Sequence, residues 1–421
     1  MANNAFSKWI VIFCLIVAGE MIFSLPFHVT RYFRPTFLDV FKLSNTALGD
    51  IFAIYGITAM LAYFPGGAIA DRYSAKKLMT ISLIATSLGG LYMAQIPDAM
   101  GLRFLYAYWG ITSILLFWAA LIRTTRDWGG SLAQGKAFGL LDGGRGFVAA
   151  AAASLSVIIF SQLMPAELDS VNNTDRTHAL QAVVYLYTIL TIASGLLIWF
   201  FIPEVKNHTP PLKNSIYNMQ FVLSKHIVWL QAIIVICAYC GYKGLDNYAL
   251  YAVEVLGMNE IESARFTSIS AYLRPLGAIT AGFLVDKFCA SKIIKHGFLI
   301  LVISYFILAI STPSTFLLYI IYTNIIVTFI AVFAIRGVYF ALVEESKVSK
   351  NITGTAVGLI SVIGFTPDVF FASIAGRLLD ANPGIEGHQY FFILLTVFSV
   401  IGMVTTIIFS RMNITNEEKI I

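Results

Sequence analysis

Charged side chains are scarce in this sequence. Asp, Glu, Lys and Arg make up 12% of the 421 residues, whereas hydrophobic residues make up 58%. A soluble globular chain carries about 25% charged residues, so this composition excludes a soluble enzyme, a nucleic-acid-binding protein and a disordered protein. The basic residues behind the formal net charge of +5 lie between apolar segments, so their distribution indicates the membrane topology. We expect no nucleic-acid partner.

Cysteine and catalytic motifs are equally scarce. Of the four cysteines, Cys237 and Cys240 form a CxxC pair. No second thiol or histidine pair accompanies it, so we expect both to pack as small hydrophobic residues. The strings GxxxxGK(S/T), HExxH and GxSxG are absent, which disfavours a P-loop ATPase and makes a membrane-embedded enzyme the least favoured function. We expect no cofactor and no metal.

Long apolar runs are abundant instead. Twelve of them reach about 18 residues or more, enough for a helix to cross the hydrocarbon core of a bilayer. Unbroken stretches such as LLYIIYTNIIVTFIAVFAI (317–335) exclude the alternating pattern of a membrane β-barrel. We predict an all-α integral membrane protein with no appended soluble domain, whose first run inserts without cleavage. The predicted spans are 9–34, 46–69, 78–96, 102–123, 136–163, 178–202, 226–252, 264–285, 293–311, 315–341, 352–376 and 388–410.

The distribution of lysine and arginine predicts the orientation of these spans. If the N-terminus lies in the cytoplasm, most of the basic loop residues lie on the cytoplasmic side as well, among them Lys8, Lys77 and Lys419. Cytoplasmic loops of membrane proteins carry such an excess. We therefore expect a multi-pass plasma membrane protein, of the bacterial inner membrane, with both termini cytoplasmic.

The sequence contains an internal repeat. GAIADRYSAKKLM (67–79) matches GFLVDKFCASKII (282–294), and GKAFGLL (135–141) matches GTAVGLI (354–360). Similar offsets indicate two parallel halves of six helices each. The predicted domains are an N-terminal half at 1–202, a cytoplasmic linker at 203–225 and a C-terminal half at 226–421.

Twelve spans in two parallel halves, with GxxxD(R/K)xxxx(K/R) after spans 2 and 8, resemble the major facilitator superfamily of secondary transporters. The first loop and YKGLDNY (242–248) resemble the organophosphate antiporter branch and its uncharacterised bacterial relatives. The resemblance implies a monomer that works by a rocker-switch movement, with spans 1, 4, 7 and 10 around a central cavity. In that branch, spans 1 and 7 each carry a phosphate-binding arginine. The corresponding stretches here hold His28 and Arg31, and Lys243.

The repeated loop is a candidate gate. A glycine at position 67 would permit close helix approach, and Asp71 could face Arg123, Arg126 or the start of the helix near Thr353. The alternative is that the basic residues only satisfy the positive-inside rule. The candidate gating residues are Gly67, Asp71, Arg72, Lys77, Arg126, Gly282, Asp286 and Lys287.

Ionisable residues inside the spans are the strongest functional signal. Each costs about 2.5–3.5 kcal/mol near the bilayer centre, so those that remain face the protein interior or water. The unpaired surplus is positive, which predicts an anionic or zwitterionic substrate. The candidate substrate-binding residues are His28, Arg31, Tyr239, Lys243, Asp246, Arg274, Tyr322 and Arg336.

The remaining embedded charges have other expected roles. Glu20, near the middle of span 1, is the first candidate for proton coupling, and Asp368 is the second. Asp142 with Arg145, and Lys243 with Asp246, are spaced i, i+3 and are expected to neutralise each other. Pro275 and Pro367, each beside a charge, are expected to kink their helices.

These features predict a secondary transporter that moves a small polar organic solute by alternating access. The energy would come from an ion or solute gradient, with protons as the candidate coupling ion. The alternative within transport is a multidrug or metabolite exporter, for which an apolar cavity with few fixed cations would be expected.

Overall fold

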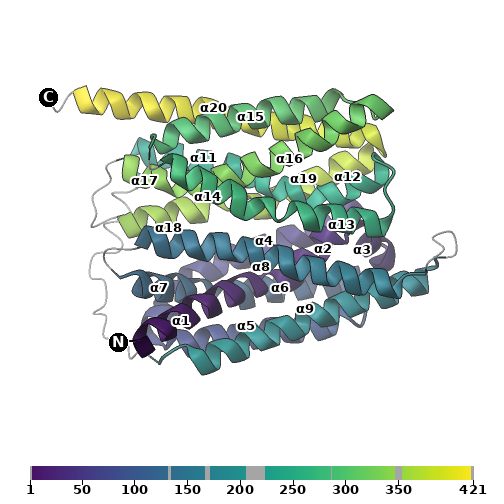
Figure 1. The fold of residues 1–421 in the computed structure, drawn as a ribbon, viewed down its shortest axis with the longest axis horizontal. Helices are drawn as coiled ribbons and strands as arrows, with labels where there is room; N and C mark the ends of the chain where they lie inside the picture. Colours follow the sequence, from purple (N-terminus) through teal and green to yellow (C-terminus); the bar gives the residue numbers. More distant parts are fainter. Residues whose placement is uncertain are drawn as a thin grey trace. The chain divides into compact units, whose positions relative to one another are not determined.

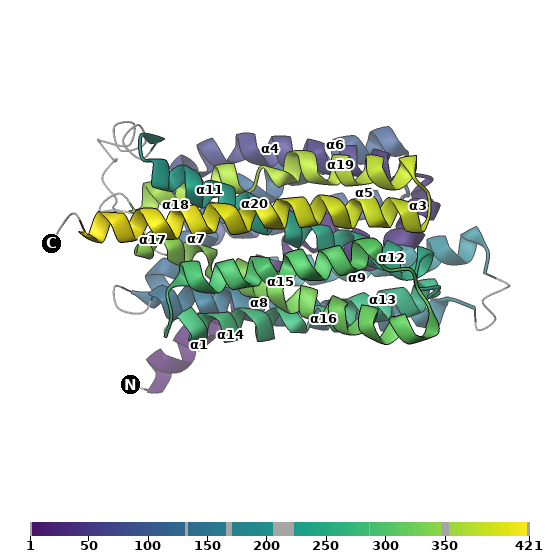
Figure 2. The same cartoon turned by 90° about the horizontal axis from the view of Figure 1, so that it is seen from above.

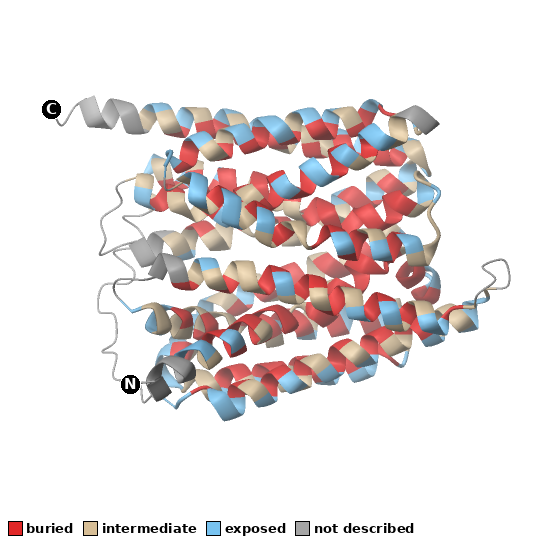
Figure 3. Ribbon diagram, viewed as in Figure 1, coloured by how far each residue is buried: buried red, intermediate tan, exposed pale blue. Residues whose placement is uncertain are grey.

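The computed structural model describes residues 2–130, 134–165, 171–204, 223–285, 287–346 and 353–418. Every regular element within these ranges is a helix (Figure 1). Buried and exposed residues alternate along the helices, as expected for helices that face both protein and lipid (Figure 3). Large apolar side chains such as Phe104, Phe200 and Tyr319 are mostly exposed, which suits contact with lipid.

In the first half of the chain, the first predicted span is broken into shorter helices, and further helices follow it. These elements are α1 (Ala2–Met21), η1 (Ser24–His28), α2 (Val29–Tyr32), α3 (Arg34–Phe41), α4 (Asn45–Arg72), α5 (Ala75–Met93), α6 (Ala99–Ile114), α7 (Trp118–Gly129), α8 (Gln134–Leu163) and α9 (Asn173–Phe201).

The second half repeats the pattern with more interruptions. Its elements are α11 (His226–Gly244), η3 (Leu245–Asn247), α12 (Tyr248–Glu254), α13 (Glu260–Ser270), α14 (Leu273–Val285), α15 (Ala290–Ile310), α16 (Thr315–Val338), η4 (Tyr339–Ala341), α17 (Leu342–Glu345), α18 (Thr353–Gly364), α19 (Pro367–Ala381) and α20 (Ile385–Glu418).

The twelve predicted spans are all helical. Within the described residues, ten helices are long and apolar enough to cross a membrane, and the bent pair Lys8–Met21 and Ser24–Tyr32 adds an eleventh. The remaining predicted span, 78–96, is α5, which begins with Lys76 and Lys77 in its first turn. The predicted fold class, an all-α membrane protein with twelve helices, is confirmed.

The helices are packed into two compact units. Unit 1 holds the described residues of 1–209, 246–272 and 372–380, and unit 2 holds those of 210–245, 273–371 and 381–421. The segments 246–272 and 372–380 belong to the predicted C-terminal half in sequence but pack with the N-terminal half. Most of the predicted linker, 205–222, lies outside the described residues.

Several helices are interrupted where the sequence contains proline. α13 ends at Ser270 and α14, with Pro275 in its first turn, begins at Leu273; α18 ends at Gly364 and α19 begins at Pro367. The first span bends by 42° next to the π-helix that contains Pro26. Proline lacks a backbone N–H and clashes with the preceding turn, so a helix breaks or bends there. The helices are thus interrupted beside Pro275 and Pro367, while the predicted change of direction there stays a prediction.

Four of the helices that start at one end of unit 1 begin with a capping residue. Ser44 caps α4, Asp98 caps α6, and Asn172 and Asn259 open capping boxes on α9 and α13. Their side chains accept hydrogen bonds from the first-turn N–H groups, which have no partner inside the helix. This end of unit 1, where α3 lies opposite the N-terminus (Figures 1 and 2), is called the distal end below.

Candidate functional site

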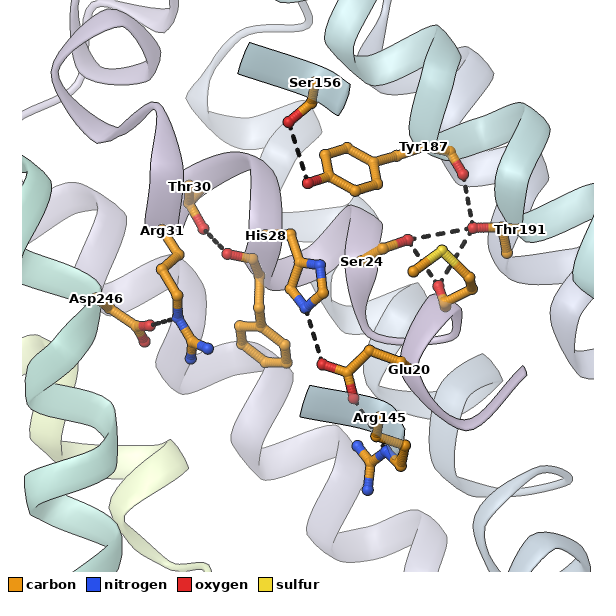
Figure 4. A network of polar contacts seen from close by, with 12 residues as sticks. Glu20, Ser24, His28, Thr30, Arg31, Arg145, Ser156, Tyr187, Thr191 and Asp246 are labelled. Carbon is orange, nitrogen blue, oxygen red and sulfur yellow. Dashed lines mark hydrogen bonds and ion pairs between the residues drawn. The ribbon is translucent and has the colours of Figure 1, made fainter. Parts of the chain in front are cut away.

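The first cluster of embedded charges lies in unit 1 around Glu20 (Figure 4). One carboxylate oxygen, Oε1, lies 3.2 Å from Nε2 of His28. The other, Oε2, accepts a hydrogen bond of 3.0 Å from Nε of Arg145. All three side chains are buried. The carboxylate is therefore held between a histidine of η1 and an arginine of α8.

Polar side chains line the same region. Ser24 donates to the carbonyl of Met21 at 2.7 Å and lies 3.2 Å from the hydroxyl of Thr191 on α9. The ring of His28 meets the ring of Tyr187 edge to face at 5.8 Å. Glu20, Ser24 and His28, which are spaced four residues apart, therefore lie in polar surroundings, although a π-helix interrupts the span.

Arg145 forms its salt bridge with a different carboxylate from the one that the sequence predicted. Its recorded salt bridge is with Glu20, whereas the i, i+3 spacing predicted Asp142. The cause is the close crossing of α1 and α8: a Cβ added at Gly19 would lie 3.3 Å from Cδ of Arg145, and one added at Gly144 would lie 2.6 Å from Ile16. This crossing brings the Glu20 carboxylate to the arginine.

Lys243 and Asp246 each have a partner besides the one predicted, and their pairing with each other stays a prediction. Nε of Arg31 donates to Asp246 at 2.5 Å, and Lys243 forms its salt bridge with Asp368. The helix changes from α to 3₁₀ at Leu245, between Lys243 and Asp246. Arg31 and Asp246 both belong to unit 1.

The second cluster of embedded charges lies in unit 2 around Asp368. Nζ of Lys243 lies 3.3 Å from Oδ1 of this carboxylate. The hydroxyl of Tyr239 donates to the same group, at 3.2 Å and 3.1 Å from its two oxygens. Asp368 is in the first turn of α19, directly after Pro367, where the positive end of the helix dipole favours a carboxylate.

Aromatic rings and a second cation surround this cluster. The guanidinium of Arg336 lies 3.8 Å above the ring of Tyr242, within the range of a cation–π contact. Tyr239 packs against Tyr242 at 5.7 Å and against Phe365 at 4.9 Å. Two cations, one carboxylate and three aromatic rings thus meet in unit 2. This group, Lys243, Asp368, Tyr239, Tyr242, Arg336 and Phe365, is called the Lys243 cluster below.

Two further predicted substrate residues lie on neighbouring helices of unit 2. Arg274 is buried in the first turn of α14, and Tyr322 is half-buried on α16. Their roles in binding remain predictions. Tyr242 and Phe365 were not predicted; the i, i+3 spacing of Tyr242 from Tyr239 on α11 was the available signal.

The residues of the candidate gating loop lie mostly at the surface. Asp71, Arg72, Lys77, Arg126 and Lys287 are exposed. Lys77 forms a salt bridge of 2.8 Å with Glu204. Asp286 lies outside the described residues.

The close helix approach predicted at Gly67 is not found, and its counterpart in the repeat, Gly282, shows the same. A Cβ added at either position would meet open space. Close approach occurs at Gly66, where a Cβ would lie 2.9 Å from the carbonyl of Leu115, and at Gly277, 2.7 Å from the carbonyl of Ile330. The repeat motif marks the ends of these helices rather than their contact points.

Two contacts at the ends of these helices were not predicted. Arg123 on α7 donates to the carbonyls of Ala70 and Tyr73 at the end of α4. Glu345 on α17 accepts from the backbone N–H of Ser291 at 2.8 Å, at the start of α15. Both satisfy backbone groups that a helix terminus leaves without an internal partner.

Metal-ligating residues do not cluster in the part of the chain that the structure describes, where no three His, Cys, Asp or Glu side chains could hold an ion together. Cys14, Cys237 and Cys240 are buried and Cys289 is exposed, all as free thiols.

Comparison with known proteins identifies relatives over nearly the whole chain. The family model of the Major Facilitator Superfamily matches residues 9–371. Inner membrane protein YihN of Escherichia coli is 27% identical over 95% of this chain and 94% of its own length. Inner membrane protein YqcE of the same organism is 28% identical over 97% and 96%. A probable nitrate/nitrite antiporter, NarK1 of Thermus thermophilus, is 24% identical over 63% of this chain and 58% of its own length.

Solved structures share the fold. A bacterial homolog of the human lysosomal transporter Spinster, crystallised in an inward-facing and unoccupied conformation, superposes with a TM-score of 0.72 at 16% identity, covering 98% of both chains. The nucleoside transporter NupG has a TM-score of 0.68 at 12% identity, covering 95% of this chain and 98% of its own.

Proposed function

The chain belongs to the major facilitator superfamily of transporters, and we propose that it moves a small organic anion or zwitterion across the bacterial inner membrane by alternating access. The superfamily makes it a multi-pass membrane protein and a transporter rather than an enzyme. The substrate class is the part that rests on the chemistry of this chain.

The Lys243 cluster is the observation that carries the proposal. The cluster holds two basic residues, Lys243 and Arg336, and the carboxylate of Asp368. A third basic residue, Arg274, is buried on α14 of the same unit. Opposite charges attract more strongly in a protein interior than in water, so a site with excess positive charge gains energy when an anion enters. A carboxylate or phosphate of the substrate would supply that charge.

The two cations of the cluster would contribute differently. Lys243 offers a compact positive charge, whereas Arg336 offers a planar fork of N–H donors that matches a carboxylate or phosphate with two hydrogen bonds. Tyr239, Tyr242 and Phe365 supply flat apolar surfaces for the body of an organic substrate. A small polar molecule with one acidic end fits these groups.

Asp368 occupies the position that the substrate anion would take. Its carboxylate contacts Lys243 and Tyr239, so an incoming anion must displace it. The displaced carboxylate can take up a proton, or it can bind the ammonium group of a zwitterion. Displacement therefore offers a route by which substrate binding and proton binding are coupled.

Asp368 suits proton coupling better than Glu20. The Glu20 carboxylate contacts both Arg145 and His28 and its side chain is 3% exposed, whereas the Asp368 side chain is 17% exposed. A group that exchanges protons needs access to water. We propose Asp368 as the coupling site and a positioning role for Glu20, which holds η1 against α8.

A multidrug exporter is less compatible with these contacts. Such a protein would be expected to have an apolar cavity, and buried fixed charges would oppose the entry of varied apolar or cationic drugs. The Thermus thermophilus relative is named as a probable nitrate/nitrite antiporter, which is a transporter of anions and supports the same substrate sign. Its nitrogen oxyanions differ in size from the organic solute proposed here.

The proposed orientation places both termini and the segment 205–222 in the cytoplasm. Inner membrane relatives in Escherichia coli and the excess of Lys and Arg on this side support it. The exposed loop of Asp71, Arg72 and Lys77 keeps its proposed gating role at the cytoplasmic face, because exposed side chains are available to another element when the conformation changes.

A ligand screen tests the substrate class. Purified protein is melted in the presence of matched anionic, zwitterionic, neutral and cationic metabolites, because a ligand that binds only the folded state raises the melting temperature. Anionic or zwitterionic compounds should stabilise, and Lys243→Met should abolish the effect. Stabilisation by neutral or cationic compounds that Lys243→Met leaves intact would contradict the proposal.

A further inference from the structure

Arg145 of α8 has more hydrogen-bond donors than its contacts use. Its side chain is 8% exposed, and its recorded hydrogen bond runs from Nε to Oε2 of Glu20. Within the described residues, no hydrogen bond is recorded for its terminal nitrogens Nη1 and Nη2. A guanidinium carries five N–H donors, and buried polar groups of folded proteins are normally hydrogen-bonded. The four donors of the terminal nitrogens can therefore serve a ligand.

His28 keeps Glu20 from engaging the whole guanidinium. The two carboxylate oxygens face different partners, because Oε1 lies 3.2 Å from Nε2 of His28 and Oε2 accepts from Arg145 at 3.0 Å (Figure 4). A carboxylate that faces an arginine alone frequently binds it with both oxygens. Here one oxygen lies at the histidine, so Glu20 holds Nε in place and leaves the two terminal nitrogens as a second fork of donors.

Two aromatic rings flank the same guanidinium. Its central carbon, Cζ, lies 5.7 Å from the ring centre of Phe23 and 5.8 Å from that of Trp118, within the range of cation–π contacts. The two ring centres are 6.0 Å from each other. Both rings therefore lie on one side of the cation, since rings on opposite sides would be much farther apart. Both are also half-buried, so they offer a flat apolar wall that a ligand can reach.

Both rings come from places where a membrane-spanning segment is interrupted. Phe23 is the N-cap residue of η1, and Trp118 is the first residue of α7, after a break that follows α6. The N-cap residue of α7, Phe117, makes no capping hydrogen bond with its side chain. The first-turn N–H groups of a helix lie at the positive end of its dipole. The start of α7 therefore adds positive potential near Arg145, which favours an anion.

The stem of Arg145 is fixed by the helices around it. A Cβ added at Gly19 of α1 would lie 3.3 Å from Cδ of Arg145 and 3.2 Å from Leu121 of α7. The glycine thus leaves room for the arginine stem, and the hydrogen bond to Glu20 fixes Nε. A group that is already held in one orientation loses little conformational entropy when a ligand binds to it. The terminal nitrogens are therefore preorganised.

We propose that Arg145, Phe23 and Trp118 form an oxyanion site within unit 1, and that its ligand is an organic carboxylate or phosphate with a flat apolar ring. The oxyanion accepts two parallel hydrogen bonds from Nη1 and Nη2, and the ring packs along Phe23 and Trp118. Glu20 and His28 are positioning residues, because they orient the guanidinium through Nε.

This oxyanion site shares no residue with the Lys243 cluster. Its residues all belong to unit 1, whereas the Lys243 cluster belongs to unit 2. The inference therefore does not depend on the substrate proposed for that cluster, and the two can be tested separately.

Fluorine NMR of tryptophan reports occupancy of the oxyanion site directly. The full chain is produced with 5-fluorotryptophan, both as wild type and with Lys243→Met, which removes a cation of the Lys243 cluster. The chain has six tryptophans, and Trp118→Phe identifies the resonance of Trp118. The internal control is Trp128, which packs against Trp9 at 6.0 Å on the side of unit 1 opposite the distal end (Figure 1).

Probes of similar shape separate charge from size. Benzoate carries a carboxylate on a flat ring, benzamide is its neutral counterpart, and benzylammonium is a cation. In both backgrounds benzoate should shift the Trp118 resonance until it saturates and leave Trp128 in place, whereas benzamide and benzylammonium should shift neither.

Two variants remove different parts of the site. Arg145→Lys keeps the charge that faces Glu20 but loses the fork, so benzoate should bind about tenfold more weakly. Phe23→Leu removes one ring and should also weaken binding, because the ligand loses an aromatic contact. Arg265→Lys, at an exposed position, is the matched control and should bind benzoate as the parent protein does.

The Trp118 resonance of the parent protein decides the inference. If benzoate leaves it unchanged, or if benzamide shifts it equally, the oxyanion site is overturned, and this result does not depend on how well any variant folds. A shift of equal affinity in Arg145→Lys overturns it as well. Inorganic phosphate should bind more weakly than benzoate, and equal affinity would overturn the assignment of a ring-bearing ligand.

The Lys243→Met background separates this inference from the proposed function. A shift that occurs in the wild type but is lost in this background would assign the signal to the Lys243 cluster, so it would overturn the oxyanion site and leave the proposed function in place. Each variant is first checked for a single folded species by size-exclusion chromatography.

Discussion

Removing the negative charge of Asp368 should strengthen the binding of an anionic substrate. Coulomb's law at an effective dielectric constant of about 20 gives ~5 kcal/mol for unit charges 3.3 Å apart, the separation of Lys243 and Asp368, and ~1.3 kcal/mol in water. An incoming anion must overcome this attraction before it reaches Lys243. If Asp368→Asn releases only part of it, ~1.4–2.7 kcal/mol, anion affinity should rise about tenfold to a hundredfold.

The same reasoning predicts how binding depends on pH. Protonation of Asp368 removes the competing negative charge, so the wild-type protein should bind an anion more tightly as the pH falls. The variant has no carboxylate at this position and should show a flat profile over the same range.

Calorimetric titration of the anion found in the screen, repeated across pH, measures both effects. Asp142→Asn is the matched control, because it removes a carboxylate embedded in unit 1 and should leave the wild-type profile in place. A pH profile that is the same in Asp368→Asn and wild type would refute the competition between Asp368 and the substrate.

Three further outcomes are expected. Arg336→Lys keeps the charge but loses the two-pronged hydrogen bond, so anion binding should weaken by ~1.5–3 kcal/mol. The control Arg265→Lys, at an exposed site, should have no effect. Equal affinities in the wild-type protein and both variants would exclude Arg336 as a ligand. Glu20→Gln leaves Arg145 without its carboxylate and should destabilise the fold by about 3–5 kcal/mol, seen as a lower melting temperature; an unchanged value would contradict the positioning role. A cysteine placed at Asn207 should not react with an impermeant reagent added to intact cells, and rapid labelling there would reverse the proposed orientation.

Much of the site could be predicted because a membrane penalises charge. Glu20, His28 and Lys243 were predicted because each is an ionisable residue within an apolar run, and such residues must face the protein interior. This argument uses only the chain near each residue, so it needs no tertiary information.

The partners of these charges could not be predicted in the same way. Local spacing assigned Asp142 to Arg145, whereas the salt bridge of Arg145 is with Glu20. It gave no indication of the salt bridge between Lys243 and Asp368. A salt bridge depends on how two helices cross and how each is rotated. The crossing of α1 and α8 is set by small residues on both helices, and no single helix contains that information.

The sequence by itself determined that the chain is a helical membrane protein with twelve spans, an internal repeat and a surplus of embedded positive charge, because hydrophobicity and insertion cost act on each segment separately. Only the tertiary structure decided which charges neutralise one another and which helices touch. The contacts of Glu20 with Arg145 and of Arg31 with Asp246 link residues 125 and 215 positions apart. Such pairing follows from the packing of helices against each other, where steric fit at positions such as Gly19 and Gly144 selects one arrangement that the sequence pattern alone leaves open.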